Sequence, residues 1–165
     1  MSAFDNKRKK AFLAGRELCS LDDPNDSLVD RCKFNFHYFT VQDAGQNFPD
    51  WSHGDLISLL QHIKEYCNFP LSHWMRQPIG KSGTVLAIYG GFPKKSDFSH
   101  PKHVPHQARW GRFRLNHSKR LIGFTIPPEL NGVEHRGSGL RYCSNTFYAV
   151  FLDADHRFWV SGEAK

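Results

Sequence analysis

Residues 110–126, which read WGRFRLNHSKRLIGFTI, predict a β-hairpin. The run Trp110–Leu115 alternates along its length, which is typical of a strand, and Leu121–Ile126 is a second, mostly apolar run. Asn116, His117 and Ser118 stand between the two runs, and polar residues of this kind favour a tight turn. The stretch therefore predicts two neighbouring antiparallel strands.

Three other runs predict strands around this hairpin. Residues 32–41 alternate between apolar and polar side chains, as a strand with one apolar face does. Residues 83–89 read as a buried strand that ends at a pair of glycines. Residues 146–152 are apolar on both faces, which suits a strand at the centre of a sheet. We therefore expect a sheet of four or five strands.

One segment has the spacing of an amphipathic helix. Ser52, with Asp55 three residues later, predicts its N-terminus, and residues 68–70 (Asn-Phe-Pro) end it. The apolar stripe between these signals consists of Leu56, Leu59, Leu60, Ile63 and Cys67. Shorter helical pieces are expected at residues 7–18 and 71–75.

The expected fold class is α+β, with an antiparallel sheet of about four or five strands and N-terminal helices packed on one face. The length of 165 residues fits a single domain, residues 1–165. Residues 1–30, a basic helical segment followed by an acidic turn, are expected at its periphery.

The positive charge of the chain is concentrated in its C-terminal part. Residues 1–93 carry ten Lys and Arg against ten Asp and Glu, whereas residues 94–165 carry twelve against six. The excess is densest between Lys102 and Arg120, a stretch that contains no carboxylate. Such a local field attracts polyanions, of which nucleic acid is the commonest. The alternative interpretation is a solvated basic face without a partner.

The composition excludes several classes of protein. A hydrophobic content of 39% with fourteen Phe indicates a folded globule. No apolar run approaches the roughly 20 residues of a membrane span, and residues 11–18 are too short and too interrupted for a signal peptide. We therefore expect a cytoplasmic protein with no membrane partner. The four cysteines form no C-x-x-C pair, which favours free thiols over a zinc site.

The basic strand could carry a phosphate clamp. Alternation places Trp110, Arg112 and Arg114 on one face, with Gly111, Phe113 and Leu115 on the other. Guanidinium groups suit bidentate contact with phosphate, and an indole suits stacking on an unpaired base. The alternative is a solvated sheet face whose arginines pair with nearby carboxylates, although the run from Lys102 to Arg120 supplies none.

Four histidines are candidates for a chemical role: three lie close together in one loop, and one follows the last strand. His100, His103 and His106 resemble a metal cluster, but the prolines among them prevent a helix and spread the rings apart. We expect no metal ion and no other cofactor, and interpret these residues as loop histidines that contact RNA, transfer a proton or are inert. His156 follows the last strand, where Asp153 or Asp155 could orient it for acid–base work. The alternative interpretation is that His156 is an ordinary turn residue.

The order of these elements resembles the RelE/ParE/YoeB toxin superfamily. The likeness covers roughly residues 105–160 and lies in three stretches: residues 112–114 (RFR), residues 120–126 (RLIGFTI), and residues 147–152 (FYAVFL) leading to His156. Members of this superfamily are small α+β proteins, many of them endoribonucleases that cleave mRNA on the ribosome. The resemblance implies RNA as partner, possible action on the ribosome, and a cognate protein inhibitor, or antitoxin.

The resemblance also implies roles for individual residues. Cleavage would be metal-independent, by attack of a 2′-OH on the adjacent phosphate, with Arg112 and Arg120 stabilising the charge and His156 as acid or base. The expected nucleic-acid-binding residues are Arg114, Trp110, Lys102, Arg109, Lys119, His103, His106, Arg157 and Trp159. Two alternatives stay open: a non-catalytic nucleic-acid-binding or host-interaction module, and an unrelated α+β enzyme that acts on a small phosphorylated substrate.

Overall fold

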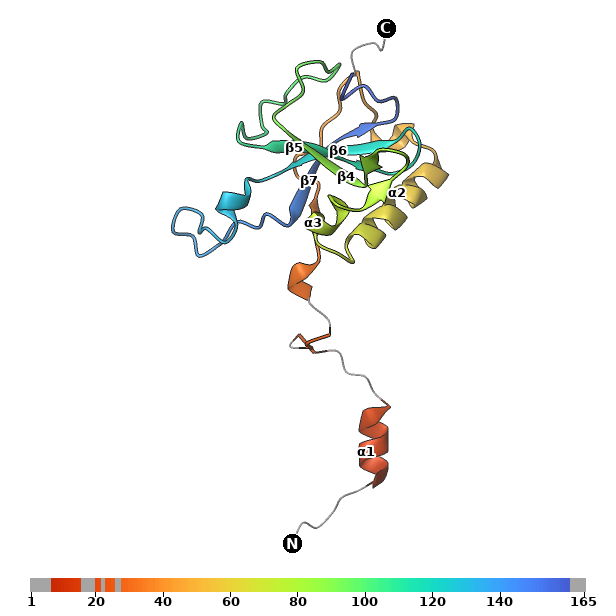
Figure 1. Ribbon diagram of the computed structural model, residues 1–165, viewed down its shortest axis with the longest axis vertical. Helices are drawn as coiled ribbons and strands as arrows, with labels where there is room; N and C mark the ends of the chain where they lie inside the picture. The colour runs from red at the N-terminus through yellow and green to blue at the C-terminus, as the bar shows by residue number, and fades with distance from the viewer. Residues whose placement is uncertain (1–6, 16–19, 22, 26–27, 161–165) are drawn as a thin grey trace.

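The computed structural model describes residues 7–15, 20–21, 23–25 and 28–160, and its fold is α+β, as predicted. Figure 1 shows one main sheet with the long helix α2 beside it. The sheet has five strands in the order β1-β7-β6-β5-β4, and every neighbouring pair except β1–β7 is antiparallel. Its strands are β1 (Lys33–Asn35), β4 (Leu86–Gly90), β5 (Arg109–Arg114), β6 (Arg120–Thr125) and β7 (Thr146–Asp153).

The predicted hairpin is confirmed as β5 and β6. The two strands pair from Arg109 opposite Thr125 to Arg114 opposite Arg120. The side chain of Asn116 forms the turn, since its Oδ1 accepts hydrogen bonds from the backbone N–H groups of Ser118 and Lys119. This local bonding explains why a short polar turn could be predicted from three residues.

The predicted interior strand is confirmed as β7, which lies between β1 and β6. The prediction for residues 32–41 is wrong beyond Asn35, because β1 is only three residues long. The side chain of Asn35 accepts a hydrogen bond from the backbone N–H of His37, and this bond turns the chain out of the sheet. Because β1 runs parallel to β7, the sheet is mixed rather than purely antiparallel.

The predicted strand at residues 83–89 is divided in two. β3 (Gly83–Thr84) pairs with β2 (Pro78–Ile79) in a small second sheet, and β4 resumes at Leu86. Val85 marks the division, since its N–H donates to the carbonyl of Gln77 while its own carbonyl accepts from Arg114. The backbone of Val85 thus joins the two sheets.

The main helix, α2, spans His53–Tyr66 and agrees with the prediction. The Ser52 Oγ accepts from the backbone N–H of Asp55, which is the predicted N-cap. A short helix α3 (Leu71–Trp74) follows, and three 3₁₀ turns lie at Leu28–Asp30, Phe48–Asp50 and Pro128–Leu130. The basic helix α1 (Lys7–Ala14) lies apart from the sheet in Figure 1. The predicted end of this helix, residues 16–18, lies outside the described residues.

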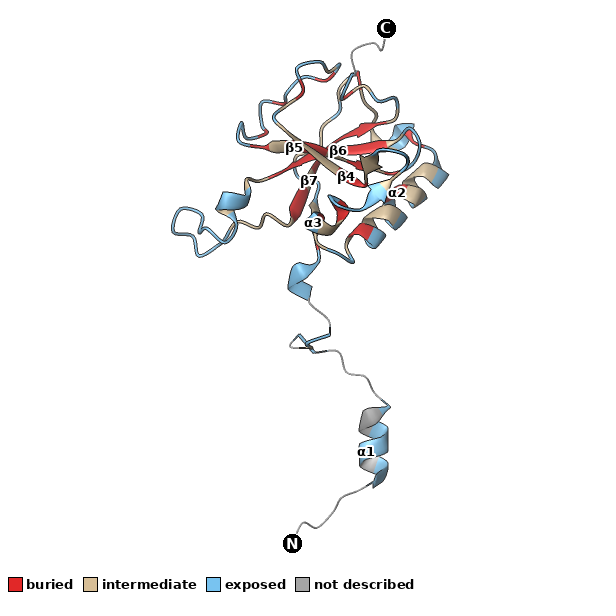
Figure 2. Ribbon diagram, viewed as in Figure 1, coloured by how far each residue is buried: buried red, intermediate tan, exposed pale blue. Residues whose placement is uncertain are grey.

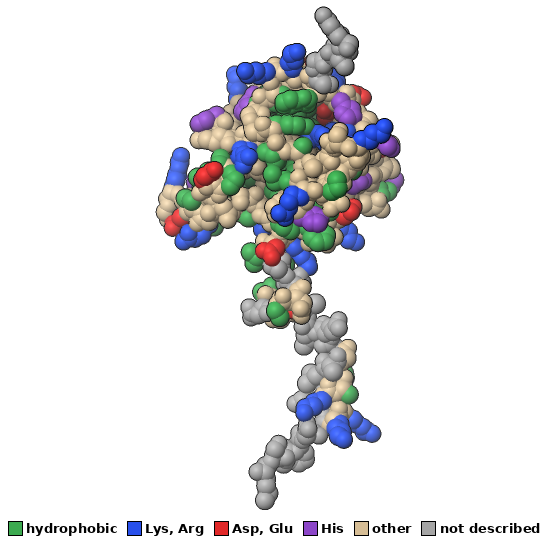
Figure 3. Space-filling model, viewed as in Figure 1, with side chains coloured by type: hydrophobic (Ala, Val, Ile, Leu, Met, Phe, Trp, Pro, Cys, Tyr) green, Lys and Arg blue, Asp and Glu red, His purple; other side chains and the backbone are tan. Residues whose placement is uncertain are grey.

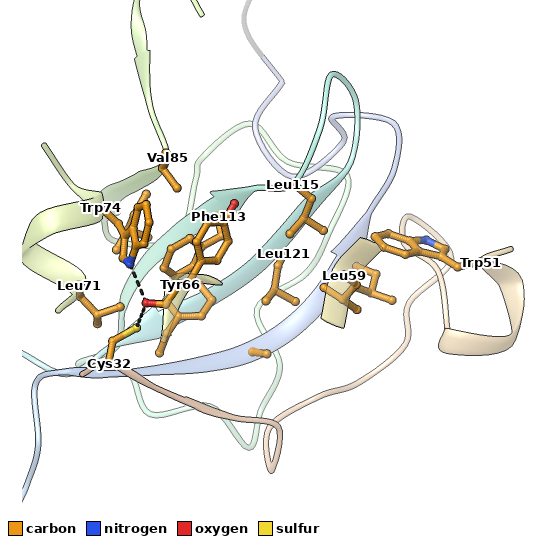
Figure 4. Packing of buried hydrophobic residues seen from close by; sticks show 14 residues of the cluster. Cys32, Trp51, Leu59, Tyr66, Leu71, Trp74, Val85, Phe113, Leu115 and Leu121 are labelled. Atoms are coloured by element: carbon orange, nitrogen blue, oxygen red, sulfur yellow. Dashed lines mark hydrogen bonds between the residues drawn. The ribbon is translucent and has the colours of Figure 1, made fainter. Parts of the chain in front are cut away.

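Hydrophobic side chains cover both faces of the sheet. On one face, Tyr66 of α2 stacks on Phe113 with ring centroids 4.6 Å apart, and its phenol donates to the Arg114 carbonyl. The Tyr66 carbonyl accepts from the Trp74 indole and the Cys32 thiol, as Figure 4 shows. Helices therefore pack on one face, as predicted.

The opposite face has its own core, built from loops. Here Trp110, Phe124 and Phe151 pack against Phe98 and Phe158, which come from the loops after β4 and β7. Figure 2 shows the resulting burial along β6 and β7. All six residues of β6 are buried, so neither face of this strand meets solvent.

Three cysteines, Cys32, Cys67 and Cys143, are free thiols, and Cys19 lies outside the described residues. Burial raises the pKa of the Cys32 thiol to about 12, which keeps it protonated. Among the described helices, none is both long and apolar enough to cross a membrane.

Close approach between strands depends on Gly123 in β6. A Cβ at this position would overlap the carbonyl oxygen of Tyr148 and lie 2.7 Å from the Phe147 ring. The pairing of β6 with β7 shifts register here, with Val150 as the extra residue on β7. Only glycine fits without moving the backbone of β7.

We expect Gly123→Ala to lower the free energy of unfolding by about 3 kcal/mol or more, because both colliding groups belong to the core strand. Gly54→Ala is the matched control. It lies in the first turn of α2 with no close neighbour, and the change should stabilise by about 0.5–1 kcal/mol. Urea unfolding of both variants measures the difference. Equal stabilities would contradict the close approach.

Candidate functional site

A cavity of about 210 Å³ lies where β4, β5 and β6 meet the turn that follows β7. We call it the arginine cavity. Its lining consists of Tyr89, Arg112, Arg120, Ile122, Asp153, His156, Phe158 and Trp159. Two cations, one carboxylate, one imidazole and one phenol thus share a single small space.

Arg120 is the most buried cation of this cavity, with only 4% of its surface exposed. Its Nη1 donates to the carbonyls of Asn116 (2.7 Å) and Lys119 (2.9 Å), and its Nη2 donates to the carbonyl of His117 (3.2 Å). The guanidinium therefore closes the β5–β6 turn from within. Its Nε is buried and has no partner.

Arg112 lies on the same face of the hairpin. It is opposite Ile122 in the β5–β6 register, which makes it a diagonal neighbour of Arg120 at a backbone separation of about 7–8 Å. Its Nε donates to the Tyr89 hydroxyl at 2.6 Å, whereas its buried Nη1 has no partner. Both arginines thus keep one buried N–H donor that the protein itself does not use.

Tyr89 is held at this place by an irregularity in β4. It is the extra residue where the β4–β5 register shifts between Ile88 and Gly90. Such bulges turn a side chain toward a particular point, here toward Arg112. Gly90 then takes a φ of 87°, a conformation that glycine adopts without strain, and leads the chain out of the sheet.

Asp153 organises the turn on the other side of the cavity. It is opposite Arg120 in the β6–β7 register and only 1% exposed. Its carboxylate accepts from the backbone N–H groups of Asp155, Arg157 and Phe158 at 2.9–3.2 Å. These bonds tie residues 153–158 into one compact turn.

His156 stands at the top of this turn with a φ of 59°, in the left-handed region. Its side chain is exposed, and its Nε2 lies 3.2 Å from the carbonyl oxygen of His117 in the β5–β6 turn. Because a carbonyl only accepts, we assign the proton to Nε2. The neutral ring then keeps a lone pair on Nδ1, available as a base.

The electrostatics of the cavity favour an anion. Burial, together with repulsion from Arg112 and Arg114, lowers the pKa of Arg120 to about 10, so it stays charged at neutral pH. Burial also raises the pKa of Tyr89 despite the opposing charge of Arg112, which keeps the phenol protonated. An anion between the guanidinium groups would accept their unused N–H donors and reduce their repulsion.

The structure brings together four of the residues predicted from the sequence: Arg112, Arg120, His156 and Trp159 all line the arginine cavity. Arg114 lies opposite Arg120 on the same face but outside the cavity lining, with its Nη1 beside Gly80. Arg114 therefore contributes to the positive potential at the arginine cavity without lining it.

Other residues predicted to bind nucleic acid lie outside the arginine cavity. Trp110 is 1% exposed within the second core, so it offers no stacking surface. Arg109 lines a different cavity, next to α3, since alternation turns it to the opposite face from Arg112. Lys119 binds the carboxylate of Asp55 on α2 at 2.8 Å, so this basic residue does have an acidic partner.

The rest of the basic stretch does not gather at the cavity. On the face of the protein drawn in Figure 3, Lys and Arg side chains are scattered rather than gathered in one patch. Lys102, His103 and His106 are exposed loop residues outside the cavity lining, and His103 stacks on Tyr38. Arg157 pairs with Asp97 at 2.9 Å. Within the described ranges, no group of three or more His, Cys, Asp or Glu side chains could hold a metal ion.

Sequence reasoning missed Tyr89 as a member of the site. The only signal was its position as the last side chain of a strand before Gly90 and Gly91. Comparisons with known protein families, curated protein sequences and solved structures find no match for this chain.

We expect inorganic phosphate to stabilise the protein through this cavity. Each ten-fold excess over Kd adds about 1.4 kcal/mol, which raises Tm by about 3–5 °C for a chain of this size. Arg112→Gln should abolish the increase. Arg109→Gln, on the same strand but the opposite face, should retain it. Thermal melts in phosphate and in chloride at equal ionic strength measure the effect, and an equal response of both variants would refute the assignment.

Proposed function

We propose that the protein is an RNA-binding endoribonuclease of the RelE-like kind, with the arginine cavity as its active site. The observation that carries the proposal is the pair of unused, buried N–H donors on Arg112 and Arg120 beside His156. Such a pair fits the non-bridging oxygens of a phosphodiester, whose negative charge grows as a nucleophile attacks.

The residues of the cavity supply the proton transfers that metal-independent cleavage needs. The 2′-OH attacks phosphorus, its proton passes to Nδ1 of His156, and the O2′–P bond forms as the P–O5′ bond breaks. The hydroxyl of Tyr89 donates its proton to the departing O5′, since its oxygen already accepts from Arg112. The products are a 2′,3′-cyclic phosphate and a 5′-hydroxyl, and solvent returns both side chains to their starting state.

Asp153 acts in this scheme as a positioning residue. Its carboxylate touches only backbone N–H groups of the turn, yet these bonds hold His156 in a left-handed conformation near the hairpin. A partner on the ribosome and a protein inhibitor are further parts of the proposal, which the superfamily resemblance implies.

We expect His156→Asn to reduce RNA cleavage by 10²–10⁴-fold, since that is the usual contribution of a general acid or base. Asparagine tolerates the left-handed backbone, so the turn should survive the change. His53→Ala, an exposed histidine at the start of α2, is the matched control and should cleave normally. A gel of total RNA, with and without ribosomes and with EDTA present, gives the readout.

The same assay distinguishes the alternatives. If the wild type binds RNA but does not cleave it, the protein is a non-catalytic binding module and not a nuclease. Full activity of the His156→Asn variant would refute the assigned base. Loss of cleavage on adding EDTA would refute a metal-independent reaction.

A further inference from the structure

A second cavity adjoins the arginine cavity. It measures about 430 Å³, against about 210 Å³ for the first, and its lining consists of Tyr89, Gly91, Phe92, Pro93, Lys94, Lys95, Trp159 and Val160. Tyr89 and Trp159 line both cavities, so this pair of rings forms their shared wall. The larger volume falls in the range of sites that hold a small planar molecule, whereas the smaller one suits a phosphate group.

Trp159 has an exposed ring face in this wall. Its indole stacks on Tyr89 with centroids 4.6 Å apart and an interplanar angle of 24°, which covers one face. Nevertheless 49% of its surface is exposed, so the exposure falls on the other face and the edges. The remaining tryptophans, Trp51, Trp74 and Trp110, are between 1% and 6% exposed. An exposed aromatic side chain in the wall of a cavity, here called the platform, is a typical ligand contact.

Two lysines flank this platform. Lys94 and Lys95 are exposed, and neither pairs with a carboxylate among the described residues. Their segment is fixed alongside the Trp159 segment, since the N–H of Val160 donates to the Lys95 carbonyl and the N–H of Asp97 donates to the Arg157 carbonyl. The nearby acid Asp97 is already bound to Arg157. The lysines therefore remain available to an external anion.

We propose that this second cavity is a nucleobase subsite, which makes single-stranded nucleic acid the substrate class of the protein. A base stacks on the free face of Trp159, and Lys94 and Lys95 each bind a flanking phosphate. The phosphate between the two cavities lies at Arg112 and Arg120. The assignment of the scissile phosphate rests on the proposed function. Single strands are required because a base within a duplex is already stacked on both faces.

Intrinsic fluorescence with a short single-stranded DNA tests the subsite directly. DNA lacks the 2′-OH nucleophile, so binding is measured without cleavage. We expect saturable quenching, and its loss in Trp159→Leu together with an affinity about ten-fold or more lower, measured by anisotropy of a labelled strand. The same DNA as a duplex should bind more weakly. No quenching, or duplex binding as tight as single-strand binding, would overturn the subsite.

The lysines give a second variant that leaves the core untouched. The double change Lys94→Gln and Lys95→Gln should lower affinity and reduce the slope of log Kd against log salt by about one to two. The double change Lys64→Gln and Lys81→Gln removes equal charge from exposed lysines outside this cavity and should leave the slope within about half a unit of the wild type. Equal slopes for the two double variants would overturn the lysine contact.

The outcomes separate this subsite from the nuclease proposal. DNA binding with Trp159 quenching but without RNA cleavage would support the subsite and refute the nuclease. RNA cleavage that the Trp159 and lysine variants leave unchanged would support the nuclease and refute the subsite.

Discussion

The site depends on two buried charges of opposite sign that face each other across β6 and β7. Arg120 and Asp153 are register partners, 4% and 1% exposed, and each is held by hydrogen bonds to backbone groups of its own turn. A buried charge without such partners costs several kcal/mol, so the two turns must close around these side chains. The same bonds that satisfy the charges therefore shape the cavity.

The arrangement leaves an excess of positive charge at one end of the sheet. Arg112, Arg114 and Arg120 share a face, and Asp153, the one carboxylate that lines the arginine cavity, accepts three hydrogen bonds from backbone N–H groups. Both guanidinium groups line the arginine cavity, and each keeps one buried N–H donor without a protein partner. The cavity is thus small, aromatic and cationic.

Local signals predicted much of the fold. The period-2 alternation of residues 110–115, the turn at Asn116 and the Ser52 cap each involve residues within a few positions of one another, and all are confirmed. The prediction of a strand at residues 32–41 is wrong beyond Asn35, because a hydrogen bond to the side chain of Asn35 ends β1 early. The strand at residues 83–89 divides at Val85, whose partner Gln77 belongs to another sheet. No periodicity in a strand reveals such bonds.

The sequence by itself determined which side chains share a face, because that depends only on the alternation of a strand. It thus placed Arg112 and Arg114 together and marked His156 at the end of the last strand, whereas the register of the hairpin brought Arg120 to the same face. Only the tertiary structure decided which of these groups stay accessible. Trp110 is buried in a core that distant loops build. Lys119 forms an ion pair with Asp55 of α2. Tyr89 lines the arginine cavity because a bulge in β4 turns its side chain toward Arg112. Burial and pairing are set by segments far apart in the chain, and no local pattern encodes them.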